Sequence, residues 1–285
     1  MALKGNLLYN GDFERGGIDG WINGAFGNLA ECQLYVTGEE KYRGSYGGKL
    51  YATDDFAQST VAYDKTCCFE EYEAYLFIMY YKLQGTGALS GRLFGLDDKG
   101  NLIQQFYLGY DDEASGWRAI KAILRGFGDI THFQVGLWCY LLNQGDVLYF
   151  DEAKLIPLRS VRGHMLADYR WFNGLTSNKT WYSGLGCIGS CRLRSIVRTA
   201  NVSGTDPTLD IKLTIALFDN TSTVYTLQHS QFTGEDFEEK VISLPEASVI
   251  KVEYTLGGTD PSFNVYHHLR IEPDADVSGG GLTVY

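Results

Sequence analysis

The sequence predicts an all-β protein made of two β-sandwich domains of the jelly-roll type in tandem, and three observations support this prediction. The 285 residues include 20 Tyr, 15 Phe and 34 Gly but only 5 Pro, and aromatic residues favour strands whereas Gly favours turns. Runs that alternate between apolar and polar residues recur along the chain. Clusters of Gly or Asp separate these runs at a spacing typical of sandwiches.

The first half contains several segments that favour strands. Residues 73–85 are strongly apolar, and residues 131–142 alternate cleanly. Residues 91–108 predict a hairpin whose turn is residues 97–101, Asp-Asp-Lys-Gly-Asn. Residues 117–126 fit either a helix or a strand. Short strands joined by such turns predict a sandwich for this half of the chain.

The second half shows the same kind of pattern. Residues 209–232 predict two strands joined at residues 219–222. Further strands are predicted for residues 239–245, 248–258 and 263–273. These segments predict a second sandwich.

The domain boundary is placed near Arg159, because Pro157 suits the exit from a strand. The prediction is therefore one domain over residues 1–158, a second over residues 159–273, and a Gly-rich arm over residues 274–285. The arm is either a disordered tail or a strand donated to a neighbouring subunit.

Composition and charge exclude several classes of function. The formal net charge of −11 argues against a nucleic-acid partner, because phosphate binding needs a basic surface. No run of 18 apolar residues occurs, so we expect no membrane span. The N-terminus shows no apolar stretch of signal-peptide length. Either a signal has been removed, or the protein reaches the exterior by another route such as release of a virion, or the protein is intracellular.

The six cysteines do not follow a zinc-binding pattern. They are Cys32, Cys67, Cys68, Cys139, Cys187 and Cys191. Cys187 and Cys191 are close enough in sequence for a local disulfide. A long-range bridge from Cys32 or Cys139 to the Cys67–Cys68 pair is an alternative, and so are buried free thiols.

Two segments that bracket the first half carry a family resemblance. Residues 6–21 (NLLYNGDFERGGIDGW) combine an apolar run, Asn-Gly-Asp, a Phe-Glu pair and a Gly-rich loop closed by Trp21, and residues 145–158 (GDVLYFDEAKLIPL) form an alternating strand around Asp151. With residues 43–53, residues 72–82 and Trp117 at the family's positions, this half resembles the carbohydrate-binding modules of families 4 and 9. The resemblance implies a galactose-binding-like jelly roll in which the first and last segments are neighbours.

The resemblance also implies a structural calcium ion where the first segment meets the last strand. Asp12, Glu14 and Asp151 fall in the matching segments, and carboxylates are the hard oxygen ligands that calcium needs. The alternative is that these carboxylates cap turns or accept backbone N–H bonds.

Strand alternation sorts the candidates for a sugar-binding groove. The sets 75/77/79/81 and 133/135/137/139 are apolar and should form the core, so the residues between them should face outward. In the resembling family that face is a concave groove. The candidate groove residues are Tyr51, Tyr80, Lys82, Gln134, Trp138 and Tyr140. The alternative is that Trp138 and Tyr140 are buried under the second domain or at a subunit interface.

The sequence shows no catalytic motif, so we expect no enzyme. Carboxylate pairs such as Asp97–Asp98 sit in turn-like contexts, and adjacent His267 and His268 should point to opposite strand faces. The resulting hypothesis is a homo-oligomeric structural protein on the surface of a virion or other extracellular assembly, with other structural subunits and a glycan or cell-surface polysaccharide as partners. The alternatives are a secreted carbohydrate-binding protein or non-catalytic fragment of a polysaccharide hydrolase, and a small enzyme that acts on sugars.

Overall fold

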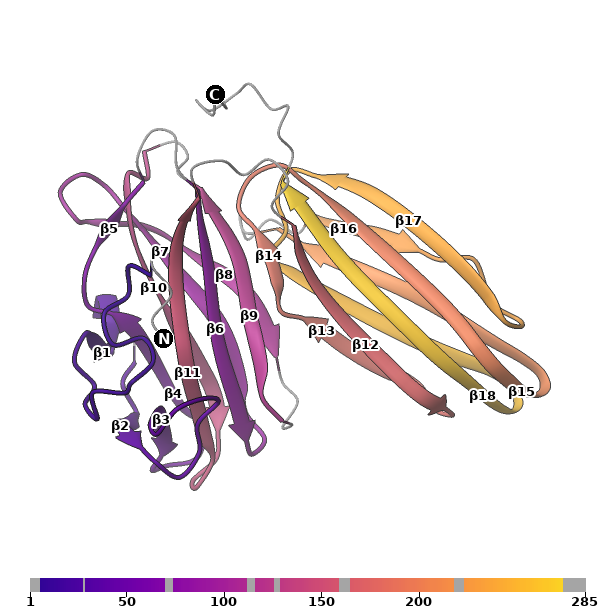
Figure 1. The fold of residues 1–285 in the computed structure, drawn as a ribbon, viewed down its shortest axis with the longest axis horizontal. Coiled ribbons are helices and arrows are strands. Elements are labelled where there is room, and N and C mark those ends of the chain that lie inside the picture. Colours follow the sequence, from indigo (N-terminus) through magenta and orange to yellow (C-terminus); the bar gives the residue numbers. More distant parts are fainter. Residues whose placement is uncertain are drawn as a thin grey trace. The chain divides into compact units, whose positions relative to one another are not determined.

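Strands joined by turns make up nearly all of the described chain (Figure 1). The computed structural model describes residues 6–27, 29–69, 74–111, 116–125, 129–158, 165–217 and 223–273. Within these ranges the one helical element is a single 3-10 turn, η1 (Ala25–Gly27). The predicted all-β class is therefore confirmed. The predicted arm over residues 274–285 lies outside the described residues.

The described residues divide into two compact units, here called unit 1 (residues 6–158) and unit 2 (residues 165–273). Unit 1 is a sandwich of two antiparallel sheets. Sheet A has the strand order β1 (Trp21–Asn23), β4 (Ala57–Tyr63), β10 (His132–Leu142), β7 (Ala88–Leu96) and β8 (Leu102–Asp111), and β5 (Cys67–Cys68) also pairs with β10. Sheet B has the order β9 (Arg118–Arg125), β6 (Ala74–Gln84), β11 (Val147–Leu158), β3 (Gly47–Ala52) and β2 (Cys32–Thr37).

The core of unit 1 lies between the two sheets and follows the predicted alternation. Phe77 and Met79 of β6 and Phe133 and Leu137 of β10 are completely buried. The residues between them on each strand are partly exposed or face other polar groups. The predicted hairpin is also present, since Asp97 N donates to Asn101 O at 3.0 Å between β7 and β8. Within residues 117–126, which fitted a helix or a strand, residues 118–125 form strand β9.

The N-terminal segment lies against β11, as the resemblance implied. Leu7 N donates to Leu155 O, and Leu155 N donates to Asn6 Oδ1, each at 2.8 Å. Ala153 N also donates to Gly11 O at 2.8 Å. A Cβ at Gly11 would collide with Ala153 O, so this approach requires glycine. The two segments that bracket this half are therefore neighbours.

Buried aromatic rings hold this junction together. Trp21 packs against Phe13 (ring centroids 5.6 Å apart), Tyr63 (5.8 Å) and Phe150 (6.0 Å). All four side chains are at most 3% exposed. Burying such a ring contributes roughly 1.5–3 kcal/mol, so this cluster fixes the first segment on the sandwich.

Unit 2 is built around two long antiparallel strands, β15 (Cys191–Ala216) and β18 (Val249–Pro273). One half of this pair is flanked by β12 (Leu166–Leu175) and β17 (Asp236–Leu244), and the other half by β13 (Lys179–Ser183) and β16 (Val224–Gln228). The short strand β14 (Leu185–Cys187) precedes β15. The sequence predicted two separate strands where β18 is a single one.

The long strands bend back on themselves, so that their two halves form facing layers. Tyr254 and His267 both belong to β18, 13 residues apart, yet their side chains are hydrogen-bonded at 2.7 Å. A straight strand would separate them by about 40 Å. The bend coincides with register shifts between Ala200 and Thr208 and with positive φ at Asn201 and Asp260. Bulges of this kind bend strands, and here they convert one hairpin into a sandwich.

Cys187 and Cys191 are not joined by a disulfide, so the prediction of a local bridge is wrong in this structure. Both side chains are completely buried. Cys187 exchanges backbone hydrogen bonds with Ala247, whereas Cys191 starts β15 and pairs with Leu244 and Pro273. The two cysteines are thus hydrogen-bonded through their backbones to different segments, and both side chains lie in the apolar interior.

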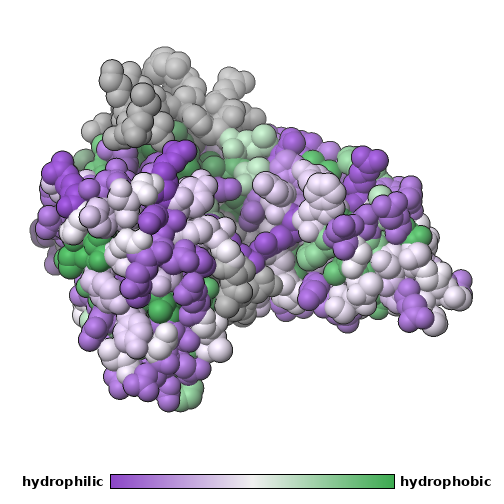
Figure 2. All heavy atoms as spheres, turned by 60° about the horizontal axis from the view of Figure 1, so that its bottom comes forward, coloured by the Kyte–Doolittle hydropathy of each residue, from purple (hydrophilic) through white to green (hydrophobic). Residues whose placement is uncertain are grey.

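The surface drawn in Figure 2 is mixed, with hydrophilic residues predominant and hydrophobic ones in small groups. Within the described ranges, no helix has the length and apolar character needed to cross a lipid bilayer.

Candidate functional site

The outer face of sheet A carries a group of aromatic and polar side chains that we call the aromatic–arginine face. Its members are Arg92, Tyr107, Gln134, Trp138 and Tyr140. The last three occupy alternate outward positions of β10, as predicted. Arg92 of β7 lies opposite Gly136, and Tyr107 of β8 lies opposite Arg92, so the strand register brings all five side chains to one face.

The side chains of this face are packed face to face. The guanidinium carbon of Arg92 lies 3.8 Å from the ring centroid of Tyr107 and 4.2 Å from that of Trp138. Trp138 and Tyr140 stack with centroids 4.3 Å apart and ring planes at 25°. Both rings remain partly exposed. The Arg92 guanidinium and the Tyr140 ring thus both stack on the Trp138 ring.

Glycine at position 136 lets the strands beneath this face pair closely. A Cβ at Gly136 would collide with the backbone carbonyl of Val61 on β4. The register places Gly136 beside both Ala62 and Arg92. Glycine at this position therefore permits the close pairing of β10 with β4.

Polar groups of this face keep unused hydrogen-bonding capacity. Within the described residues, Arg92 has no carboxylate at ion-pair distance, and burial lowers the pKa of its guanidinium although Tyr107 opposes this effect. Arg92 Nε, Gln134 Oε1 and Ser90 Oγ are buried without a hydrogen-bond partner. Each such group costs about 1–3 kcal/mol, so a polar ligand that reached them would recover part of this cost.

One end of the same sheet face is closed by the chain itself. Phe26 of η1 packs on Phe94 of β7, with ring centroids 4.8 Å apart. Ala25, Ala62 and Leu96 complete this small apolar cluster. The aromatic–arginine face therefore begins where the cover by η1 ends.

The other three groove candidates lie on sheet B, so the prediction that all six share one groove is wrong. Tyr80 and Lys82 belong to β6, and Tyr51 belongs to β3. Tyr80 stacks on Tyr42 at 3.8 Å, and Lys82 forms an ion pair with Glu40 at 2.8 Å. Alternation indicates which residues of a strand face outward, but it does not indicate to which sheet the strand belongs.

The outer face of sheet B is covered by the loop that contains Tyr42. Lys49 of β3 pairs with Glu39 of this loop at 2.7 Å, and that carboxylate raises the pKa of Lys49. The rings of Trp117 and Tyr42 meet in a T-shaped arrangement, with their centroids 5.8 Å apart. This face is thus engaged with the chain's own residues, in contrast to the aromatic–arginine face.

Two of the candidate calcium ligands, Glu14 and Asp151, accept backbone N–H groups. Asp151 Oδ2 accepts the backbone N–H groups of Tyr42 (2.9 Å) and Arg43 (3.0 Å), and its Oδ1 accepts that of Glu152 (2.6 Å). Glu14 Oε1 accepts the N–H groups of Ser45 and Tyr46. Converging N–H donors repel a cation. Among the described residues, no group of three or more His, Cys, Asp or Glu side chains has metal-binding geometry.

These carboxylates instead fix the loop over sheet B. Asp151 is completely buried, and burial raises the pKa of its carboxyl group to about 7 although the three N–H groups lower it. Asp12 lines a hollow together with Arg15 and Lys154. Glu14 and Asp151 therefore follow the alternative to calcium binding, in which these carboxylates accept backbone N–H bonds.

Unit 2 contains a buried polar chain that sequence analysis missed. Ser195 Oγ lies 2.8 Å from His229 Nε2 and 2.7 Å from His267 Nε2. His229 Nδ1 lies 2.8 Å from Glu238 Oε2, and His267 Nδ1 lies 2.7 Å from the hydroxyl of Tyr254. The residues are far apart in sequence, so no motif signals them.

The Ser195–His229–Glu238 part of this chain has the connectivity of a catalytic triad, but its location rules out a nucleophile. Ser195 and His267 are completely buried and His229 is 2% exposed. A triad serine must reach a substrate carbonyl, whereas this hydroxyl lies between two imidazole rings. These side chains form a satisfied hydrogen-bond network in the interior of unit 2.

Comparisons with known proteins give similar structures only. No protein-family model and no curated protein matches the chain. The N-terminal CBM22-1–CBM22-2 tandem domain of Paenibacillus barcinonensis Xyn10C aligns with 94% of this chain and 97% of its own, at 11% identity and a TM-score of 0.42. A family 16 carbohydrate-binding module aligns with 53% of this chain and 99% of its own, at 20% identity and a TM-score of 0.37.

A third similar structure is the enzymatically active domain of tailspike protein 4 of bacteriophage CBA120. It aligns with 54% of this chain but only 21% of its own, at 11% identity and a TM-score of 0.42. Carbohydrate-binding modules recur among these structures, but none of the three is named as family 4 or 9. At these identities and TM-scores the likeness assigns no function to the chain.

Proposed function

We propose that unit 1 is a non-catalytic glycan-binding domain and that the aromatic–arginine face is its binding surface. The observation that carries this proposal is the stacked pair of Trp138 and Tyr140 beside the Arg92 guanidinium. Sugar rings present flat C–H faces that stack on aromatic rings, and their hydroxyl groups need hydrogen-bond donors and acceptors close by. Sites for small polar ligands combine these two elements.

Arg92 supports this role because its position is fixed before a ligand arrives. Its side chain is only 6% exposed and lies between two rings. Side chains that are already ordered lose little conformational entropy on binding. Arg92 thus supplies a donor of fixed direction over the Trp138 ring.

The test is affinity electrophoresis of the full chain in gels that contain soluble polysaccharides, together with a glycan array. Trp138→Ala and Tyr140→Ala should each weaken binding about tenfold or more. Tyr80→Ala is the matched control, because it removes a stacked ring from sheet B and should leave binding unchanged. Equal losses for Tyr80→Ala and Trp138→Ala, in variants that remain folded, would contradict the proposed surface.

The wider proposal is that the protein is a homo-oligomeric structural subunit on the surface of a virion or other extracellular assembly. Two β-sandwich units, one of which presents a glycan-binding face, would suit attachment to a cell-surface polysaccharide. The alternative, a secreted binding protein or hydrolase fragment, would use the same face. Size-exclusion chromatography with light scattering separates them, because a stable oligomer is expected for the first and a monomer for the second.

A further inference from the structure

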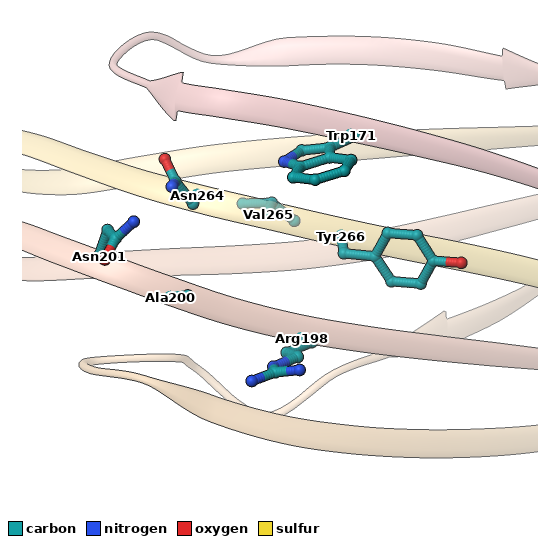
Figure 3. Close-up of a pocket in the computed structure, with 7 residues that line it drawn as sticks. All are labelled: Trp171, Arg198, Ala200, Asn201, Asn264, Val265 and Tyr266. Atoms are coloured by element: carbon teal, nitrogen blue, oxygen red, sulfur yellow. The ribbon is translucent and has the colours of Figure 1, made fainter.

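Unit 2 has a hollow on its outer surface that the sequence analysis did not single out (Figure 3). We call it the unit 2 hollow. Its lining comes from three neighbouring strands: Trp171 of β12, Asn264, Val265 and Tyr266 of β18, and Arg198, Ala200 and Asn201 of β15. Its volume is about 450 Å³, which is within the size range of small-ligand sites.

The strand register explains why a hollow forms here. Trp171 lies opposite Tyr266, and Tyr266 lies opposite Arg198, so three long side chains form a row across the sheet. The next outward row consists of Ala200 opposite Asn264, which are both short. A low row beside a tall row leaves a depression whose wall is aromatic.

The aromatic wall is open to solvent. Trp171 is 73% exposed and Tyr266 is 40% exposed. In Figure 3 the Trp171 indole lies over β18, between Asn264 and Tyr266. Large exposed aromatic side chains grouped around a depression are typical of binding sites.

Arg198 differs from the other arginines on the same sheet face. Arg194 is paired with Glu239, and Arg192 lies 4.0 Å from Glu272. Arg198 is exposed, and among the described residues no carboxylate or other partner contacts it. In a chain of net charge −11, an arginine in a hollow without an acidic partner favours an anionic ligand.

Asn264 adds a directed donor to the hollow. Its Oδ1 accepts the backbone N–H of Gly174 at 2.8 Å. This bond fixes the orientation of the amide, so that Nδ2 is left as the group for other partners. The hollow therefore combines ring faces, one free guanidinium and an amide donor.

We infer that the unit 2 hollow is a second saccharide site, independent of unit 1, which takes a sugar that carries a carboxylate. Trp171 and Tyr266 offer ring faces to the sugar, and the planar guanidinium of Arg198 matches a carboxylate with two parallel hydrogen bonds. Uronic and sialic acids both have this chemistry. This inference goes beyond the glycan-binding role proposed for unit 1, and neither depends on the other.

The test is calorimetric titration of the full chain with three acidic probes: tetragalacturonate, an alginate tetramer and sialyllactose. At least one probe should bind, and its methyl ester should bind at least tenfold more weakly. Arg198→Gln and Trp171→Ala should each reduce affinity tenfold or more. Both side chains are exposed, so the variants should fold, which circular dichroism checks.

Two further variants make the outcome specific. Arg192→Gln removes the same charge from the same sheet face outside the hollow and should change affinity less than twofold. Trp138→Ala, which tests the unit 1 surface, should not affect binding of the acidic probe. Absence of binding for all three probes, equal binding of acid and ester, or equal losses for Arg192→Gln and Arg198→Gln would overturn the inference. Loss of self-association in Trp171→Ala without probe binding would instead assign the hollow to a second copy of the chain.

Discussion

The buried hydrogen-bond network of unit 2 predicts that acid destabilises this unit before Glu238 loses its charge. Burial raises the pKa of Glu238, but hydrogen bonds from Ser230 and His229 lower it to about 2, so its carboxylate only accepts hydrogen bonds at neutral pH. His229 Nδ1 must then donate to Glu238, and His229 Nε2 accepts the Ser195 hydroxyl. Ser195 in turn accepts from His267 Nε2, and His267 Nδ1 accepts the hydroxyl of Tyr254.

With the donors and acceptors arranged in this way, every side chain of the network has its hydrogen bonds only while both imidazoles are neutral. Burial lowers the pKa of His267 to about 3, and it also lowers the pKa of His229. A histidine whose pKa is lower in the folded state than its ordinary 6.5 stabilises the fold above pH 6.5, and this stabilisation is lost as the pH falls toward 3. At 1.36 kcal/mol per pH unit, His267 alone accounts for at most about 5 kcal/mol. That is comparable to the whole stability of a small domain.

Hydrogen-exchange mass spectrometry of the full chain at pH 7, 6, 5 and 4 measures this effect for each unit separately. The unfolding free energy of peptides from unit 2 should fall steadily across this range. His267→Gln, which cannot titrate, should be less stable at pH 7 and show a much flatter slope. His268→Gln is the matched control on the exposed side of the same strand and should keep most of the slope. Equal slopes in His267→Gln and the parent protein would refute the reasoning.

Three further predictions follow from unit 1. Burial raises the pKa of Asp151 to about 7, so its contribution to stability is present at low pH and lost as the pH rises through 7. The stability of Asp151→Asn relative to the parent protein should therefore improve between pH 5 and pH 8. Urea titrations at the two pH values measure this difference. Gly136→Ala should lower the melting temperature by 5 °C or more, because its Cβ meets the Val61 carbonyl, whereas Gly116→Ala, with open space around its Cβ, should shift it by less than 2 °C. Lys82→Gln removes a partly exposed ion pair with Glu40, and chemical denaturation should show a loss below about 1 kcal/mol; a larger loss would mean that the loop depends on that pair.

The part of the fold that the sequence predicted is the part that depends on local patterns. Alternation placed Phe77, Met79, Phe133 and Leu137 in the core, and the contact between the first and last segments of unit 1 followed from the family resemblance. The bent strands of unit 2 were missed, because the bend depends on bulges near Asn201 and Asp260 that leave no clear mark in the sequence.

The candidate site was predicted in part for the same reason. Gln134, Trp138 and Tyr140 share one strand, so alternation alone brings them together. Arg92 and Tyr107 join them only through the register of β7 and β8, which a single sequence does not reveal. Tyr51, Tyr80 and Lys82 were wrongly grouped with them in one groove, because strand order is a long-range property.

The most direct test of the unit 1 surface is a titration followed through the indole N–H signals of the five tryptophans by NMR. Single Trp→Phe variants assign the signals, and the glycan is one selected by electrophoresis. The Trp138 signal should shift in a saturable way, while those of Trp21 and Trp181, which are 3% and 2% exposed, should stay in place. Saturable binding of that glycan with an unchanged Trp138 signal would contradict the proposed surface.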